Sequence, residues 1–220
     1  PADIASRAAN KSSSFFMVAV LPLFYGIYFT KMLVQKKHGI RTHQIGRRKE
    51  KKLHTVEILM SAATFGIVPV QLASVLLGLS CLPDSARFTG FLLALLGDGI
   101  FLAAVLFMKD SWRAGIPESD KTALVTGGVY ALSRNPAFLG FDFMYFGVLF
   151  MYCNPFTAFF TVFAVVMLHL QILQEEKYMA AAFGEPYLEY KRTVFRYLGR
   201  KPRKSSGEAA IHDQGAKHEN

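Results

Sequence analysis

Two long apolar runs in the second half of the chain, with almost nothing between them, constrain the fold most strongly. The runs cover residues 137–152 and 155–173, and only Cys153 and Asn154 separate them, ahead of a helix-starting Pro155. A connection this short forces two consecutive helices to lie antiparallel and side by side. The sequence therefore predicts a helical hairpin whose two arms both cross a membrane.

Polar motifs flank this hairpin at its open end. The first is TGGVYALSRNPAFLG at 126–140, and the second is HLQILQEEKYMAAAFGEPYLEYKRTVFRYLG at 169–199. If both arms rise about 1.5 Å per residue from the tip, Arg134 lies opposite residue 173, within one helical turn of Glu175 and Glu176. Adjacent helical residues diverge by about 100°, so one carboxylate of the pair points inward, and we expect it to be Glu176.

Three more apolar runs precede the hairpin, at 15–34, 56–79 and 88–108. With 52% hydrophobic residues and a mean hydropathy of +0.26, the chain is too apolar for an ordinary soluble domain. The first run is too long for a signal peptide, and no clear small-residue cleavage site follows it. The predicted fold is all-α, a multi-pass transmembrane helical bundle of about five spans. No strand and helix alternation is present to build a Rossmann domain.

The net charge of +9 is distributed unevenly between the apolar runs. Basic residues are abundant in 35–55, in 109–135 and after 174, whereas the short turn at 81–87 holds only Arg87. The positive-inside rule then places the N-terminus outside and the C-terminus in the cytosol, of a bacterial inner membrane or of the endoplasmic reticulum, with both polar motifs on the cytosolic face. We expect contacts with anionic lipids and none with nucleic acid. The oligomeric state is not predicted.

These patterns divide the chain into four parts. Residues 1–13 form a mobile leader, and 14–108 hold three membrane helices with the basic cytosolic loop 35–55. Residues 109–199 form a core made of a polar loop, the hairpin 136–173 and an amphipathic helix from 174 to about 198. A disordered basic tail at 200–220 follows. Glycines at 90, 97 and 99 are expected to permit close helix packing.

The two cysteines, Cys81 and Cys153, lack the spacing of a metal site, so no metal is predicted. Both fall on the predicted outer face. A disulfide between them in an oxidising compartment is an open hypothesis.

Three motifs taken together resemble the superfamily of isoprenylcysteine carboxyl methyltransferases and phospholipid methyltransferases. They are SRNPAFLG at 133–140, LQEEKY at 173–178 and FGEPYLEYKRTVFR at 183–196. The family has an Arg-His-Pro-x-Tyr-x-Gly run, a glutamate pair on the following helix and a Phe-Gly-x-x-Tyr-x-x-Tyr segment. The likeness covers roughly residues 110–199. Asn135 stands where the family has His and Phe138 where it has Tyr, so an acid or base role of that His does not transfer.

The resemblance implies S-adenosylmethionine as the methyl donor and a lipid-like or prenylated acceptor that enters from the bilayer. The residues that it implies for the donor site are Thr126, Gly128, Tyr130, Arg134, Asn135, Pro136, Phe138, Gly140, His169, Glu175 and Glu176. Within this set, Arg134 can pair with the donor's carboxylate in a bidentate geometry. The predicted catalytic residues are Arg134, Glu176 and Asp142. Asp142 lies about one turn from His169 in the hairpin register, where the pair either tunes the acceptor or makes a structural hydrogen bond.

Two other function classes stay open. The first is an NADPH-dependent enzyme similar to the membrane sterol reductases, which carry an Arg-Asp pair and a Cys where residues 174–177 stand here. The glutamate pair argues against this class. The second is a noncatalytic lipid-binding or scaffold protein, which Asn135 and Phe138 keep open. The sequence does not choose between a prenylcysteine carboxylate, a phospholipid amine and another amphiphile as acceptor.

Overall fold

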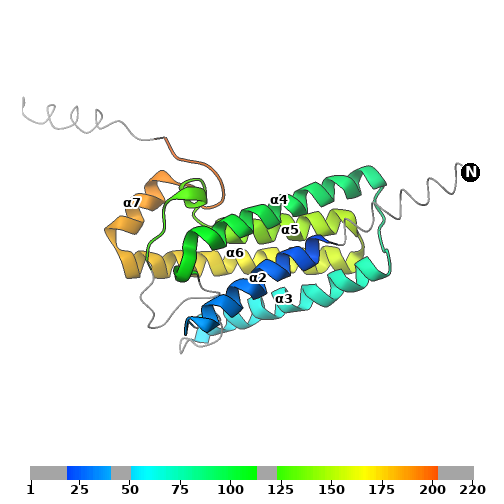
Figure 1. Cartoon of the computed structure of the whole chain (residues 1–220), viewed down its shortest axis with the longest axis horizontal. Coiled ribbons are helices and arrows are strands. Elements are labelled where there is room, and N and C mark those ends of the chain that lie inside the picture. The colour runs from blue at the N-terminus through cyan, green and yellow to red at the C-terminus, as the bar shows by residue number, and fades with distance from the viewer. Residues whose placement is uncertain (1–18, 41–50, 113–122, 203–220) are drawn as a thin grey trace, which may run out of the picture.

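The protein is a bundle of helices in the computed structural model, which describes residues 19–40, 51–112 and 123–202. The helices are α2 (Val20–Lys37), α3 (Lys51–Leu76), α4 (Asp84–Met108), α5 (Pro136–Met151), α6 (Pro155–Phe183) and α7 (Glu185–Thr193), with short 3₁₀ turns at Lys109–Ser111 and Gly128–Ala131. The predicted all-α bundle is confirmed (Figure 1). The leader, the middle of the basic loop, part of the polar loop and the tail beyond 202 lie outside the described residues.

The hairpin of α5 and α6 is closed by a cap that the sequence encodes. The Asn154 side chain accepts hydrogen bonds from the backbone N–H groups of Phe156 and Thr157, both at 3.1 Å. The Thr157 hydroxyl in turn accepts the Asn154 backbone N–H at 3.0 Å. This reciprocal pair satisfies the free donors of the first turn, where Pro155 needs none. The two antiparallel arms predicted from the short connection are therefore present.

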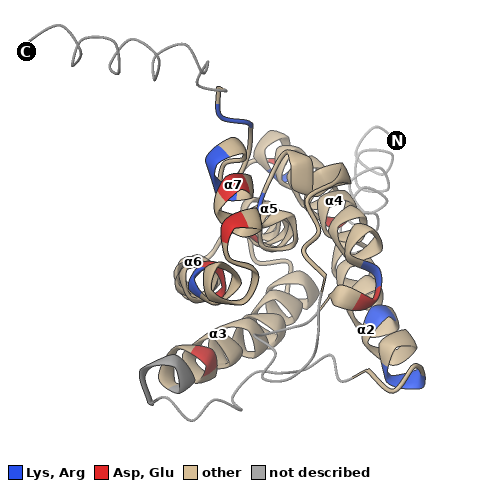
Figure 2. Cartoon of the chain, turned by 90° about the vertical axis from the view of Figure 1, so that its left-hand side faces the viewer, with Lys and Arg blue, Asp and Glu red and all other residues tan. Residues whose placement is uncertain are grey.

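The C-terminal part of the core differs from the expected single amphipathic helix over 174–198. Helix α6 continues to Phe183, because residues 174–183 contain strong helix formers and no breaker. Gly184 then ends it with a φ of 58°, and Pro186 stands in the first turn of α7. After α7 the chain turns back, and Val194 pairs with Arg200 in an antiparallel bridge. Viewed end-on, α7 lies beside the ends of α5 and α6 (Figure 2).

Three segments are long and apolar enough to cross a membrane, namely Thr55–Leu76, Asp84–Ser111 and Pro155–Phe183. Helix α5 is apolar but shorter. These segments make the chain an integral membrane protein, and the count of five spans stays a prediction. The ends of the helices that carry the basic segments lie together at the end of the bundle beside α7, which we call the α7 end (Figure 1).

Helices α4 and α5 approach closely through small residues. A Cβ atom on Gly97 would lie 2.6 Å from the backbone nitrogen of Met144, and one on Gly147 would lie 2.5 Å from that of Ala94. Gly90 and Gly140 are equally crowded by the facing backbone, but Gly99 has no atom within 4 Å. Two of the three glycines predicted for close packing are thus used for it, and Gly99 is not.

Helices α2 and α3 are neighbours in sequence but not in packing. Helix α2 packs on α4, where the rings of Phe24 and Phe101 stack with centroids 4.6 Å apart, and α3 packs on α6. Direct contacts between α2 and α3 are few. The two helices therefore border a space rather than fill it.

The glycine packing gives a direct test. Replacing Gly97 by Ala should lower stability by about 1–3 kcal/mol, because the added methyl group collides with the backbone of α5. The matched change Gly99→Ala should leave stability equal or higher by up to about 1 kcal/mol, because Ala favours helix and meets open space there. Thermal unfolding in detergent measures both, and equal loss in the two variants would contradict this account of the interface.

Candidate functional site

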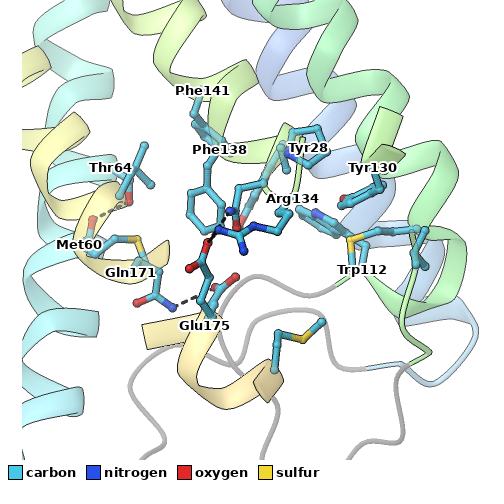
Figure 3. A pocket seen from close by; sticks show the side chains of 18 of the residues that line it. Tyr28, Met60, Thr64, Trp112, Tyr130, Arg134, Phe138, Phe141, Gln171 and Glu175 are labelled. Carbon is cyan, nitrogen blue, oxygen red and sulfur yellow. Dashed lines mark hydrogen bonds and ion pairs between the residues drawn. The ribbon is translucent and has the colours of Figure 1, made fainter. Parts of the chain in front are cut away.

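A cavity of about 530 Å³ lies at the α7 end and extends into the bundle between α2, α3, α5 and α6. Its size suits a cofactor-sized ligand. In Figure 3, Arg134 and Phe138 face this space, with Gln171 and Glu175 of α6 on one side and Tyr130 and Trp112 on the other. The sequence-predicted residues that line it are Tyr130, Arg134, Asn135, Pro136, Phe138, Glu175 and Glu176.

Arg134 and Glu176 meet as the hairpin register predicts. The Arg134 side chain precedes α5, the Glu176 side chain projects from α6, and each is only 5% exposed. The Arg134 Nη2 donates to the Glu176 Oε1 at 2.9 Å. The Nε and Nη1 of Arg134 are buried and have no partner among the described residues. Because buried N–H groups left without acceptors are costly, these two nitrogens are suited to a ligand that brings acceptor atoms.

Arg196, which the sequence analysis did not place in the site, binds the same carboxylate. Its Nε donates to Glu176 Oε1 at 3.0 Å and its Nη2 to Glu176 Oε2 at 2.9 Å. Asn135 adds a longer contact from Nδ2 to Oε1 at 3.4 Å. A buried carboxylate is tolerated when it is paired in this way. The hydrogen bond to Glu176 also raises the pKa of Arg196, so the guanidinium stays charged.

The C-terminal segment 194–200 reaches the site because it lies against the loop before α5. The Arg134 backbone N–H donates to the Phe195 carbonyl at 3.1 Å, and the Gly199 N–H donates to the Leu132 carbonyl. Asn135 Nδ2 also donates to the Arg196 carbonyl at 3.2 Å. The segment thus fixes the backbone on both sides of the buried ion pair.

Three buried tyrosines form an aromatic wall at the α7 end. The Tyr190 hydroxyl donates to the Tyr130 carbonyl at 2.6 Å and lies 3.2 Å from the Ser133 carbonyl, which anchors α7 to the polar loop. Burial raises the pKa of Tyr187 to about 12 and the pKa values of Tyr130 and Tyr190 further still. All three hydroxyls are therefore neutral near pH 7 and cannot serve as phenolate bases.

The two adjacent glutamates have different environments. Glu176 is 5% exposed and fully engaged, as expected for the inward member of the pair. Glu175 is half-buried, and its Oε1 accepts a hydrogen bond from Gln171 Nε2 at 3.0 Å. Both carboxylates line the cavity.

Five predicted residues do not line the cavity: Thr126, Gly128, Gly140, Asp142 and His169. Thr126 is exposed on the loop. Gly128 has a φ of +61° and its Cα faces the Phe107 ring, while Gly140 packs on α4, so both glycines serve backbone packing. His169 Nδ1 hydrogen-bonds the Tyr197 hydroxyl rather than Asp142. The Asp142 Oδ1 is buried without a partner in the described part of the chain.

The cavity has an apolar arm away from Arg134. Its walls include Tyr28 and Phe29 of α2, Met60 and Phe65 of α3, and Phe141 of α5. Phe29 is 47% and Phe65 58% exposed, and both line the cavity. These exposed rings in its wall, together with the few direct contacts between α2 and α3, indicate that the arm opens between these two helices.

Comparison with known proteins gives concordant matches. Residues 85–186 match the phospholipid methyltransferase family, a range that contains both Arg134 and Glu176 and starts with α4. The mouse protein-S-isoprenylcysteine O-methyltransferase is 32% identical over 111 residues, which are 48% of this chain and 38% of the relative.

Two plant relatives agree with these matches. Protein-S-isoprenylcysteine O-methyltransferase A of Arabidopsis thaliana is 34% identical over 110 residues, 48% of this chain and 55% of the relative. Protein-S-isoprenylcysteine O-methyltransferase B of the same plant is 29% identical over 168 residues, 64% of this chain and 84% of the relative. For the mouse protein and the first plant protein, the match spans about half or less of the relative's length.

The order of the motifs, the buried pair that they form and these matches agree with one another. The chain is therefore similar, over about half of its length, to the phospholipid methyltransferase family and to isoprenylcysteine O-methyltransferases.

Proposed function

We propose that this protein transfers a methyl group from S-adenosylmethionine to a lipid-like or prenylated acceptor that enters from the bilayer. One observation carries the proposal: a single cavity joins the buried, partly unpartnered guanidinium of Arg134 to an apolar arm that opens between α2 and α3. A polar cofactor and an apolar acceptor can thus meet inside one site.

The residues at the polar end fit the chemical groups of the donor. The Nε and Nη1 of Arg134, which have no partner among the described residues, can each donate a charged hydrogen bond to an acceptor such as the donor's carboxylate. Glu175 suits an ammonium group, and the rings of Tyr130 and Tyr187 offer faces for a purine. When bound, S-adenosylmethionine supplies an electrophilic methyl group on a sulfonium.

Arg196 and Asn135 act by holding Glu176, which in turn holds Arg134. Two arginines share one carboxylate, so this group of three carries a net positive charge that favours an anionic ligand. Asn135 occupies the family's histidine position and contributes hydrogen bonds to Glu176 and to the Arg196 carbonyl. These contacts position the Glu176 carboxylate and the Arg196 backbone, and neither requires Asn135 to gain or lose a proton.

The site also suits a reaction that lacks a strong base. If the acceptor is a carboxylate, its charge and that of the sulfonium cancel in the transition state, which a water-poor cavity favours. The apolar walls around Phe138 and Phe141 exclude water, and alignment near 3–3.5 Å supplies further acceleration. A phospholipid amine remains the alternative acceptor, with Glu175 as the nearby carboxylate. We further propose that the α7 end faces the cytosol.

Ligand binding separates the open function classes. Calorimetric titration of the detergent-purified protein with S-adenosylhomocysteine should show micromolar binding, whereas NADPH should not bind. Binding of NADPH alone would assign the protein to a reductase class. Failure of both ligands would favour the noncatalytic class, in which Asn135 and Phe138 would be the first residues to restore to His and Tyr.

Arginine substitutions test the polar end. Arg134→Ala and Arg196→Ala should each weaken S-adenosylhomocysteine binding by about 1–3 kcal/mol, because each removes a charged hydrogen bond that fixes the donor site. Arg192→Ala is the matched control. It removes an exposed pair with Glu185 on α7 and should change binding by less than about 0.5 kcal/mol. If all three variants bind S-adenosylhomocysteine as tightly as the parent protein, the buried pair is not part of the donor site.

The lateral opening is tested with bulkier side chains. Phe65→Trp should narrow the gap between α2 and α3 and raise the KM for an S-farnesylated cysteine or for phosphatidylethanolamine severalfold, with little change in S-adenosylhomocysteine affinity. Phe159→Trp is the control, because Phe159 is 66% exposed but does not line the cavity. If both variants keep the KM of the parent protein, the acceptor enters elsewhere.

A further inference from the structure

The apolar arm contains two hydroxyl groups whose hydrogen-bonding capacity is not used up. Tyr25 of α2 and Tyr145 of α5 both line the cavity, and Tyr145 has no exposed surface. Their hydroxyl groups are neighbours, and both oxygens are buried. No other group in the described part of the chain donates to or accepts from either hydroxyl.

The hydroxyl groups of Tyr25 and Tyr145 cannot satisfy each other completely. Each phenol carries one O–H donor, so if one hydroxyl donates to the other, the second donor still has no acceptor. Leaving a buried donor unpaired costs about 1–3 kcal/mol, and the bilayer offers little water to relieve it. The hydroxyl of Thr64, also in the arm, is by contrast bonded to the Met60 carbonyl at 2.9 Å. The tyrosine pair is therefore a site that lacks one acceptor oxygen.

The pair lies at a defined depth from the polar end. Tyr145 lies ten positions after Asn135, nearly all of them in α5, which corresponds to about 15 Å along the helix axis. Phe138 and Phe141, which also line the cavity, lie between them. An acceptor whose reacting group is beside Arg134 would bring the middle or far part of its apolar chain to Tyr25 and Tyr145.

We propose that Tyr25 and Tyr145 form a specificity subsite for an oxygen atom in the apolar tail of the acceptor, an ether, carbonyl or hydroxyl oxygen about 15 Å from the reacting group. The acceptor class is then an oxygen-bearing amphiphile rather than a plain hydrocarbon chain. This inference rests on the proposed function, since it takes the Arg134 end as the place of reaction. Asp142, which precedes Tyr145 by about one turn of α5 and does not line the cavity, is an acidic neighbour of Tyr145.

Matched amphiphiles test the subsite. The probes are an S-alkyl cysteine with an all-carbon tail and a series in which an ether oxygen replaces one methylene at successive positions. Their affinities are measured by competition and by thermal shift with the full-length protein in nanodiscs, and S-adenosylhomocysteine binding is measured in the same samples. The parent protein should prefer one position of the oxygen over the all-carbon probe by about three- to tenfold.

Variants assign that preference to the hydroxyls. In Tyr25→Phe and in Tyr145→Phe, the affinity for the preferred ether probe should become about equal to that for the all-carbon probe. Each change keeps the ring and removes only the oxygen. Tyr152→Phe is the control, since Tyr152 is buried outside the cavity, and it should keep the preference. Asp142→Asn should keep it as well. Thermal unfolding is measured for each variant to check that it is folded.

The outcomes separate this inference from the proposed function. If S-adenosylhomocysteine binds and every probe binds equally well, or if the preference survives both Phe variants, the subsite is refuted while the methyltransferase proposal stands. Loss of the preference in Asp142→Asn alone would assign the recognition to that carboxylate and also refute it. If neither S-adenosylhomocysteine nor any amphiphile binds, the proposed function fails and the subsite fails with it.

Discussion

A buried carboxylate governs the structure of the α7 end. Glu176 is 5% exposed, and an ionised group at that depth is stable only when its charge and its lone pairs are matched. Its partners come from two other parts of the chain: Arg134 and Asn135 directly before α5, and Arg196 after α7. Loss of Glu176 would leave the buried guanidinium of Arg134 without a counter-charge, and loss of either arginine would leave Glu176 with fewer partners. The hairpin, the polar loop and the C-terminal segment are therefore held to one geometry, and the cavity takes its shape from it.

The sequence predicts a contact in this arrangement when regular helices connect the two residues, and it does not when a break or a chain reversal lies between them. Arg134 and Glu176 lie on two arms joined by three residues, so counting residues from the tip suffices to bring them together. Arg196 follows a glycine break, a short helix and a chain reversal, and helical periodicity carries no information across these. The signal that was available is local: Gly184 and Pro186 in FGEP are the usual residues after one helix and at the start of the next.

The roles of glycines and ionisable residues inside the apolar runs depend on tertiary packing, which the sequence does not give. A glycine can admit a ligand or a neighbouring backbone, and only the tertiary structure shows that Gly140 faces α4 while Gly99 faces open space. The hairpin register predicts Asp142 near His169, but rotation of each helix about its own axis decides which side chains meet. His169 meets Tyr197, a residue of the C-terminal segment that no hairpin argument could place.

The uneven packing of the bundle follows from its solvent. In water, an open apolar arm would cost about 25 cal/mol for each Å² that it exposes, and α2 and α3 would gain by closing. In a bilayer, lipid tails fill the same space without that penalty, so helices associate through close packing of small residues instead. Here that packing lies between α4 and α5. Because the glycine interface and the buried ion pair stabilise the bundle, α2 and α3 are free to stay apart, and a lateral entrance to the cavity costs little stability.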